Sequence, residues 1–175
     1  MTPSPPKLEY SDREIRRILD EVNVIAMVGA SSSDVKASYF VLKYLLNKGY
    51  RVIPVNPRLA GEEIVGQKVY ARLADIPEAI DMVDIFRNSE AAGDITDEAI
   101  AIGAKVVWMQ LGVRNDEAAA RARAAGLKVV MDRCVKMEYG RFSGEIGWLG
   151  YNTNRVTSRA EVLGHKTGRE ATSRE

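Results

Sequence analysis

Short apolar segments alternate along the chain with segments whose apolar residues recur at helical spacing. The apolar segments are typical of buried strands and lie at residues 24–28, within 49–57, and at 82–86, 105–109 and 128–131. The helical segments include residues 39–46, 95–102 and 118–125. Strands that alternate with helices favour right-handed crossovers and a parallel sheet. We therefore predict an α/β fold, a Rossmann-like, doubly wound, mainly parallel five-stranded sheet with helices on both faces.

The two ends of the chain differ in pattern from this central region. Residues 11–14 read Ser-Asp-Arg-Glu, a capping box, and apolar residues at helical spacing follow it, so we predict a first helix that packs on the sheet. Residues 1–10 contain three prolines and are expected to be a disordered lead-in. The predicted domain covers residues 11–142, and residues 143–175 form a polar C-terminal tail.

Length and composition restrict the functions that such a domain can have. A chain of 175 residues holds one domain and has no room for a second catalytic one. The net charge is +1 with 28% charged residues, which argues against nucleic acid as a partner. A single cysteine excludes an intramolecular disulfide, and neither a signal peptide nor an apolar run of ~18 residues is present. These features predict a cytoplasmic protein that does not bind membranes.

The turn after the first strand has part of a dinucleotide-binding fingerprint. Gly29 follows the buried run at 24–28, but Ser31 and Asp34 occupy the positions of the second and third glycines. After the second strand, where NAD sites carry an acidic residue, the chain has Asn56, Pro57 and Arg58. Arginine suits a phosphate group, so the pattern favours a nucleotide with a phosphate on its ribose. NADP and coenzyme A both meet that condition.

The sequence resembles the small single-domain CoA-binding proteins, whose domain is similar to the CoA-binding half of the succinyl-CoA synthetase α subunit. The resemblance covers residues 13–142. It rests on Val-Gly-Ala-Ser at 28–31, Tyr-Arg-Val-Ile-Pro-Val-Asn-Pro at 50–57, Val-Asp-Ile-Phe-Arg at 83–87, Val-Trp-Met-Gln-Leu-Gly at 107–112 and Met-Asp-Arg-Cys at 131–134. The resemblance implies a Rossmann-like domain that holds coenzyme A or an acyl-CoA across its strand ends, and it requires no reaction.

Residues that follow the first two strands are the first candidates for ligand binding, because ligands of open α/β sheets lie beyond the carboxyl ends of the strands. Gly29, Ala30, Ser31 and Ser33 offer backbone N–H groups and hydroxyls to a pyrophosphate, with Lys36 as a cationic partner. The alternative is a plain turn with a serine N-cap and a solvated lysine. Similarly, the Asn56 amide next to Pro57 and Arg58 either meets ribose or adenine or serves the turn.

The third and fourth strands end in further polar candidates. Arg87 needs an anion, which is either a ligand phosphate or the carboxylate of Asp84. Gln110 offers a donor and acceptors, and Gly112 permits close approach of a ligand to the backbone. Trp108 is expected to be core. The segment at 59–72 is predicted to be a long loop near the ligand, with a short extended piece at 68–70.

Cys134 follows the fifth strand and has two interpretations. If Asp132 caps a short helix, the thiol lies in its first turn near Arg133 and Lys136, which favours a thiolate that can meet the thiol of coenzyme A. Alternatively, Cys134 is a small buried apolar residue, since no histidine is near in sequence to act as a base.

The favoured function is binding of coenzyme A or an acyl-CoA without catalysis, and the alternative is an NADP-binding oxidoreductase or redox sensor. The resemblance argues against ligase activity, because the synthetase uses a histidine on a second domain and the sole histidine here, His165, lies in the tail. No Tyr-x-x-x-Lys pair or histidine is placed to act as the proton donor opposite a nicotinamide, and neither a metal-binding spacing nor a helix-turn-helix is apparent. The expected partner is a small-molecule nucleotide, and a protein partner or second copy of the chain stays open.

Overall fold

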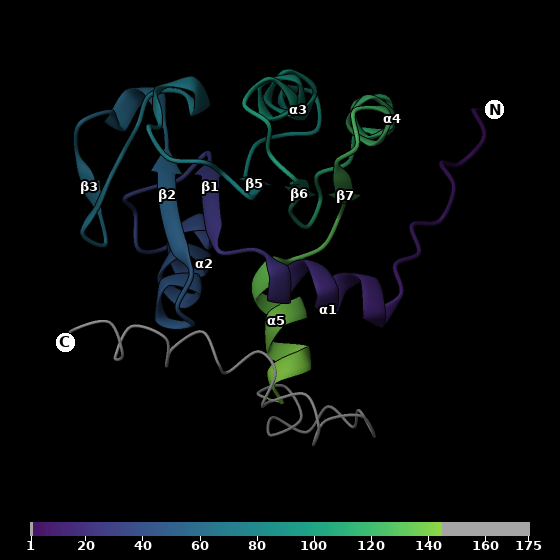
Figure 1. The fold of residues 1–175 in the computed structure, drawn as a ribbon, viewed down its shortest axis with the longest axis horizontal. Coiled ribbons are helices and arrows are strands. Elements are labelled where there is room, and N and C mark those ends of the chain that lie inside the picture. The colour runs from purple at the N-terminus through teal and green to yellow at the C-terminus, as the bar shows by residue number, and fades with distance from the viewer. Residues whose placement is uncertain (1, 145–175) are drawn as a thin grey trace.

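The computed structural model describes residues 2–144, and its centre is a parallel sheet of five strands (Figure 1). In spatial order the strands are β2 (Arg51–Val55), β1 (Val24–Val28), β5 (Met82–Ile85), β6 (Val106–Met109) and β7 (Lys128–Val130). Every neighbouring pair is parallel. The apolar runs of the sequence therefore form the predicted strands, because strands covered on both faces need apolar side chains on both.

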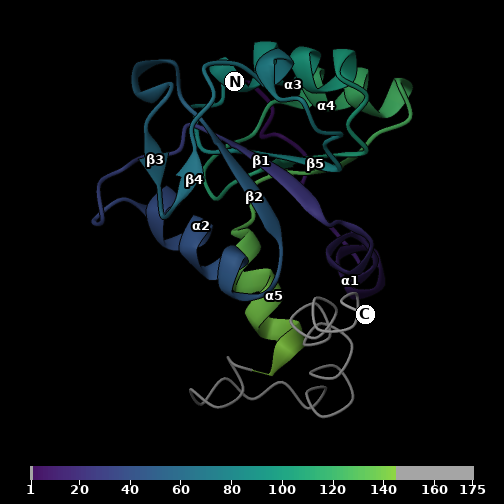
Figure 2. The ribbon, with the colours of Figure 1, turned by 60° about the vertical axis from the view of Figure 1, so that its left-hand side comes forward.

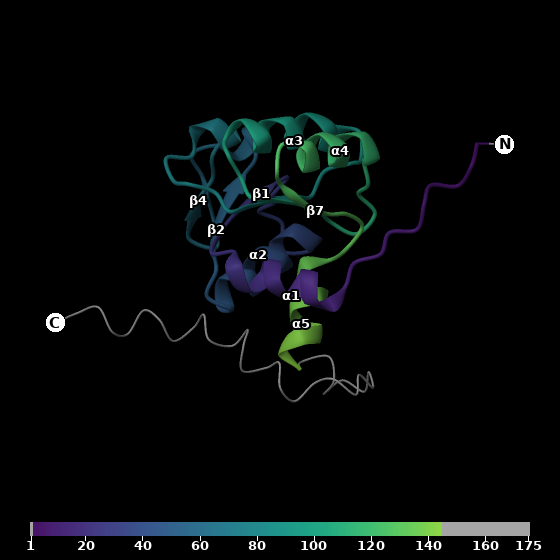
Figure 3. The ribbon, with the colours of Figure 1, turned by 45° about the vertical axis from the view of Figure 1, so that its right-hand side comes forward.

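Helices cover both faces of this sheet, which confirms the doubly wound prediction (Figures 1 and 3). One face carries α1 (Asp12–Glu21), α2 (Ala37–Asn47) and α5 (Val135–Ser143), and the other carries α3 (Ala91–Ala101) and α4 (Asp116–Ala124). The buried side chains accordingly divide into two clusters, one on each side of the sheet. The cluster on the side of α1, α2 and α5 lies directly beneath the candidate site described below.

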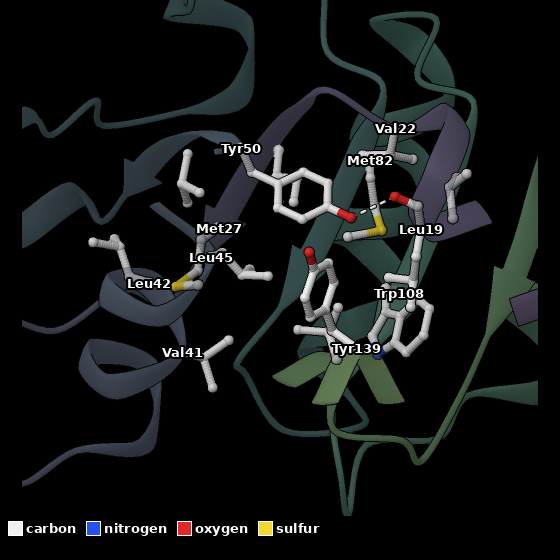
Figure 4. Packing of buried hydrophobic residues seen from close by; sticks show 14 of the residues in the cluster. Leu19, Val22, Met27, Val41, Leu42, Leu45, Tyr50, Met82, Trp108 and Tyr139 are labelled. Carbon is white, nitrogen blue, oxygen red and sulfur yellow. Dashed lines mark hydrogen bonds between the residues drawn. The ribbon is translucent and has the colours of Figure 1, made fainter. Parts of the chain in front are cut away.

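Aromatic side chains organise the cluster under α1, α2 and α5 (Figure 4). Trp108 is fully buried and its Nε1 donates to the carbonyl of Arg133 at 2.8 Å, so the prediction that it belongs to the core is confirmed. The hydroxyl of Tyr50 donates to the carbonyl of Leu19, and burial raises the pKa of Tyr50. Both polar atoms satisfy backbone carbonyls that the core would otherwise leave without a donor.

The first helix forms as its capping box predicts. The Oγ of Ser11 accepts from the N–H of Glu14 at 3.2 Å, and Ile15, Ile18 and Leu19 are buried against the sheet. The residues before this helix also make long-range bonds: the hydroxyl of Tyr10 accepts from the N–H of Met131 at 2.8 Å. These contacts tie the start of the chain to the end of β7.

The segment between β2 and β5 contains a small hairpin that the sequence analysis missed (Figure 2). Strands β3 (Glu63–Ile64) and β4 (Gln67–Lys68) pair antiparallel, and short 3₁₀ helices at Pro57–Leu59 and Leu73–Asp75 flank them. The extended piece expected at 68–70 begins one residue earlier, and Tyr70 forms a parallel bridge with Val55. Strands of two residues have no periodicity that sequence can reveal.

Candidate functional site

The sheet order creates a crevice between β1 and β5. The chain leaves β1 to form β2 on one side, whereas β5, β6 and β7 lie on the other, so the strand order reverses at β1 and β5. Ligands of open α/β sheets bind outside the carboxyl ends of the strands at such a reversal. Gly29 follows β1 and Arg87 follows β5 closely, so both predicted residues stand at the expected position.

Both the backbone conformation at residue 29 and the atoms packed around it require glycine at this position. Its φ is +87°, and its N–H donates to the carbonyl of Val55 at 3.0 Å. A Cβ at this position would lie 2.5 Å from the carbonyl oxygen of Phe86 and 2.9 Å from the Cδ of Arg87. Glycine therefore allows the end of β5 to pack against the turn after β1, which places the Arg87 side chain over that turn.

The residues after Gly29 form a loop that precedes the helix. Helix α2 begins at Ala37, and its N-cap Lys36 makes no capping bond through its side chain. Ser31 instead accepts from the N–H of Ser33 at 3.1 Å, so the alternative of a serine N-cap is wrong. Polar residues between 31 and 36 close a turn of their own before the helix starts, a competition that sequence spacing does not resolve.

Asn56 joins two turns at the edge of the crevice. Its Nδ2 donates to the carbonyl of Ala30 at 2.9 Å, and its Oδ1 accepts from the N–H of Arg58 at 2.9 Å. The amide thus serves as a cap of the short helix Pro57–Leu59 and holds the turn after β1 in place. Arg58 is exposed at the rim and forms no ion pair within residues 2–144.

Two cavities open at the carboxyl edge of the sheet, and Arg87 lines both. The larger has a volume of about 380 Å³ and is mainly apolar; besides Arg87, its lining is Ala37, Val41, Phe86, Gln110, Leu111, Val113, Cys134 and Met137. The smaller, of about 220 Å³, includes Val28, Val55 and Pro57 together with the charged residues Arg72, Asp94 and Glu98. Predicted residues from four strand ends therefore meet around Arg87.

A cavity of about 420 Å³ lies at the opposite edge of the sheet. Asp81, Lys105 and Lys128 line it, and these residues precede or begin β5, β6 and β7. Asp81 accepts from the backbone N–H groups of Asn23 and Val24, and these bonds with the bond from Lys105 lower its pKa despite burial. We assign this cavity a structural role, because ligands of this fold class bind at the other edge.

Of the two alternatives for Arg87, the ion pair with Asp84 is wrong. Asp84 pairs in register with Met27 and Trp108, so its side chain points into the cluster beneath α1, α2 and α5. Arg87 lies beyond the end of β5, is exposed, and has no ion pair within the described residues. An arginine over a glycine turn between two cavities is thus available to an anion.

Asp84 is instead bonded to Gln110, which sequence reasoning did not foresee. Its Oδ1 accepts from the Nε2 of Gln110 at 2.6 Å, and both residues are buried. Within residues 2–144, the Oδ2 of Asp84 is a buried oxygen with no hydrogen-bond partner. Burial raises the pKa of Asp84 to about 7, while the bond from Gln110 opposes the rise. The only sequence signal was an acid inside an apolar strand.

Cys134 lies beside the larger cavity, but its helix is not capped as predicted. Cys134 is itself the N-cap of α5, and Asp132 accepts from the N–H of Gly112 at 2.7 Å. Asp132 therefore stabilises the turn after β6. The cations expected near the thiol have other contacts, because Arg133 donates to the carbonyl of Leu8 and Lys136 lies over the Tyr44 ring.

The sequence analysis predicted neither a metal site nor a membrane-spanning segment, and the structure describes residues 2–144 of the chain in both respects. Within residues 2–144, no three His, Cys, Asp or Glu side chains form a group suited to a metal ion. In the same range, no helix has the length and hydropathy of a transmembrane segment. His165 and the predicted C-terminal tail from residue 145 lie outside the described residues.

Known proteins share this domain. The family model of the CoA binding domain matches residues 23–140. The uncharacterized protein YneT of Bacillus subtilis is 36% identical over 129 residues, which cover 74% of this chain and 94% of YneT. A solved structure, a hypothetical protein from Pyrococcus horikoshii, has a TM-score of 0.74 and 41% identity, with 81% of this chain and 98% of that chain covered.

A larger enzyme subunit contains a similar region. The α subunit of the ADP-forming acetate–CoA ligase I of Pyrococcus furiosus is 33% identical over 87 residues. The match covers 47% of this chain but only 19% of that subunit. The similarity therefore concerns one part of the ligase subunit.

Proposed function

This chain belongs to the CoA binding domain family, and from that premise we propose that it binds coenzyme A or an acyl-CoA at the carboxyl edge of its sheet. The observation that carries the proposal is the position of Arg87. Its side chain lies over the turn at Gly29, between two cavities, without an ion pair in the described residues. A diphosphate is the part of coenzyme A that fits a cation beside a glycine turn.

The two cavities support an assignment of the remaining parts of the ligand. The pantetheine arm is long and weakly polar, which suits the apolar cavity that contains Phe86, Leu111 and Met137. The smaller cavity adjoins Pro57, and the exposed Arg58 follows it at the rim, where a phosphorylated ribose finds a cationic partner. We assign no chemical step to the chain, since the ligase activity of the relative belongs to a subunit of which this domain matches a fifth.

Coenzyme A is expected to bind at least tenfold more tightly than NADP, and NAD more weakly still. The physical reason is that the apolar cavity receives a pantetheine arm, whereas a nicotinamide ribose brings hydroxyls that the apolar lining cannot bond. Isothermal titration calorimetry of the full chain with the three nucleotides measures the difference directly. Micromolar affinity for NAD or NADP with no detectable binding of coenzyme A would overturn the proposal in favour of an oxidoreductase or redox sensor.

The two arginines are expected to recognise different phosphates. Arg58→Ala should weaken the binding of coenzyme A by ~1.5–3 kcal/mol and leave the binding of dephospho-CoA nearly unchanged, because the position of Arg58 suits the 3′-phosphate. Arg87→Ala should weaken both ligands alike, because both carry the diphosphate.

Calorimetry with the two ligands on each variant provides the comparison, and Arg13→Ala on exposed α1 is the matched control. Equal losses of both ligands in Arg58→Ala would remove Arg58 from the proposed role. Unchanged affinities in Arg87→Ala would place the diphosphate elsewhere.

A further inference from the structure

Gln110 in the lining of the apolar cavity is hydrogen-bonded to a buried carboxyl, that of Asp84, whose purpose packing alone does not explain. Asp84 and Gln110 lie on adjacent strand ends and point to the same face, together with Trp108. Gln110 lines the cavity and is 4% exposed, whereas Asp84 is 0% exposed. A buried carboxyl with one bonded and one unbonded oxygen costs stability. Such a group is expected where it serves a ligand.

The bond to Asp84 determines which end of the Gln110 amide faces the cavity. Nε2 is directed at the carboxyl, so Oε1 is the free end. The Oδ2 of Asp84 is the buried, partnerless side-chain atom within residues 2–144, and Oε1 of Gln110 is not buried in this way. With the carboxylate in place, Gln110 therefore offers an acceptor to the cavity.

We propose that the protonation state of Asp84 selects the ligand group that Gln110 binds in this cavity. The carboxylate accepts from Nε2 and leaves Oε1 to accept from a donor, such as the thiol or an amide N–H of the pantetheine arm. The carboxylic acid, having taken a proton from solvent, donates to Oε1 and turns the amide N–H groups toward an acceptor, such as a thioester carbonyl. The identity of the ligand rests on the proposed function. Asp84 and Gln110 together then distinguish free coenzyme A from acyl-CoA.

Asp84 is expected to exchange this proton near neutral pH, because no neighbouring charge shifts its pKa further. Its neighbours on β1 and β6 are Met27 and Trp108, which carry no charge. The titratable or charged groups on this face and around the cavity are Arg87 after β5, Cys134 before α5, and the tyrosines Tyr10, Tyr39, Tyr44, Tyr50 and Tyr139. None of them is a cause of the pKa shift of Asp84, which burial raises against the bond from Gln110.

The side-chain amide of Gln110 tests the switch without any ligand. In ¹⁵N-labelled full-length protein, its two N–H signals are expected to move between about pH 5.5 and 8.5 with a midpoint near 7. Gln110→Leu identifies the signals by their loss, and Asp84→Asn should keep them constant because an amide does not titrate in this range. Signals that stay constant in the wild-type protein would overturn the proposal.

Ligand selectivity is the second measurement. The affinity ratio of acetyl-CoA to coenzyme A should be higher at about pH 5.8 than at about pH 8.2 by roughly five- to tenfold, the effect of one exchanged hydrogen bond. Asp84→Asn should make the ratio independent of pH, and Asp20→Asn on exposed α1 should behave as wild type. A constant ratio in the wild type would refute the selectivity. Binding of neither ligand would refute the proposed function, while the amide titration still decides whether Asp84 controls Gln110.

Discussion

Gly29→Ala is expected to destabilise the protein by about 3 kcal/mol and to abolish binding of coenzyme A. About 1 kcal/mol comes from the positive φ, which alanine adopts unfavourably. The larger part comes from overlap of the new Cβ with the Phe86 carbonyl and the Arg87 side chain, which forces the ends of β1 and β5 apart. Urea unfolding measures the stability, and calorimetry measures binding.

Gly103→Ala is the matched control for this variant. Gly103 has a similar φ of +75°, but a Cβ there would meet no atom within 4 Å. Its alanine variant is therefore expected to lose only about 1 kcal/mol and to bind coenzyme A normally. Equal losses in the two variants would mean that the close approach of β5 has no cost. Normal binding by a folded Gly29→Ala protein would mean that the ligand does not use this turn.

Asp84→Asn is expected to stabilise the protein at alkaline pH. The pKa of Asp84 rises from 3.8 to about 7 on folding, so the native state keeps a proton that the unfolded state releases. Stability of the wild type therefore falls as the pH rises from about 4 to 7 and then levels. At 1.36 kcal/mol per pKa unit, the advantage of the variant over the wild type should grow by about 3 kcal/mol between about pH 4.5 and 8.5.

Urea unfolding of both proteins at the two pH values checks this expectation. Taking the difference between wild type and variant removes the contributions of other titrating groups, such as Asp81, whose pKa is lowered. A difference that is the same at both pH values would show that Asp84 keeps one protonation state throughout. That result would also remove the basis of the proposed switch.

The structural roles of the strand-end residues were in some cases predicted correctly and in others not, for physical reasons. The role of Gly29 as a turn residue follows from its place after an apolar run, which is local information. The cap formed by Asn56 was one of two open alternatives, because the same amide suits a turn or a ligand. The interpretation in which Asp132 caps the helix at Cys134 was wrong, since Asp132 bonds to Gly112 at the neighbouring strand end.

The sequence by itself determined the five strands, their helices on both faces and the capping of α1, because the periodicity of burial and the bonds of a cap involve residues close in the chain. Only the tertiary structure decided that β5 lies beside β1, which brings Arg87 over Gly29, and that β6 lies beside β5, which gives Asp84 to Gln110. These contacts join residues far apart in sequence. Strand order selects such neighbours, and no local pattern encodes that order.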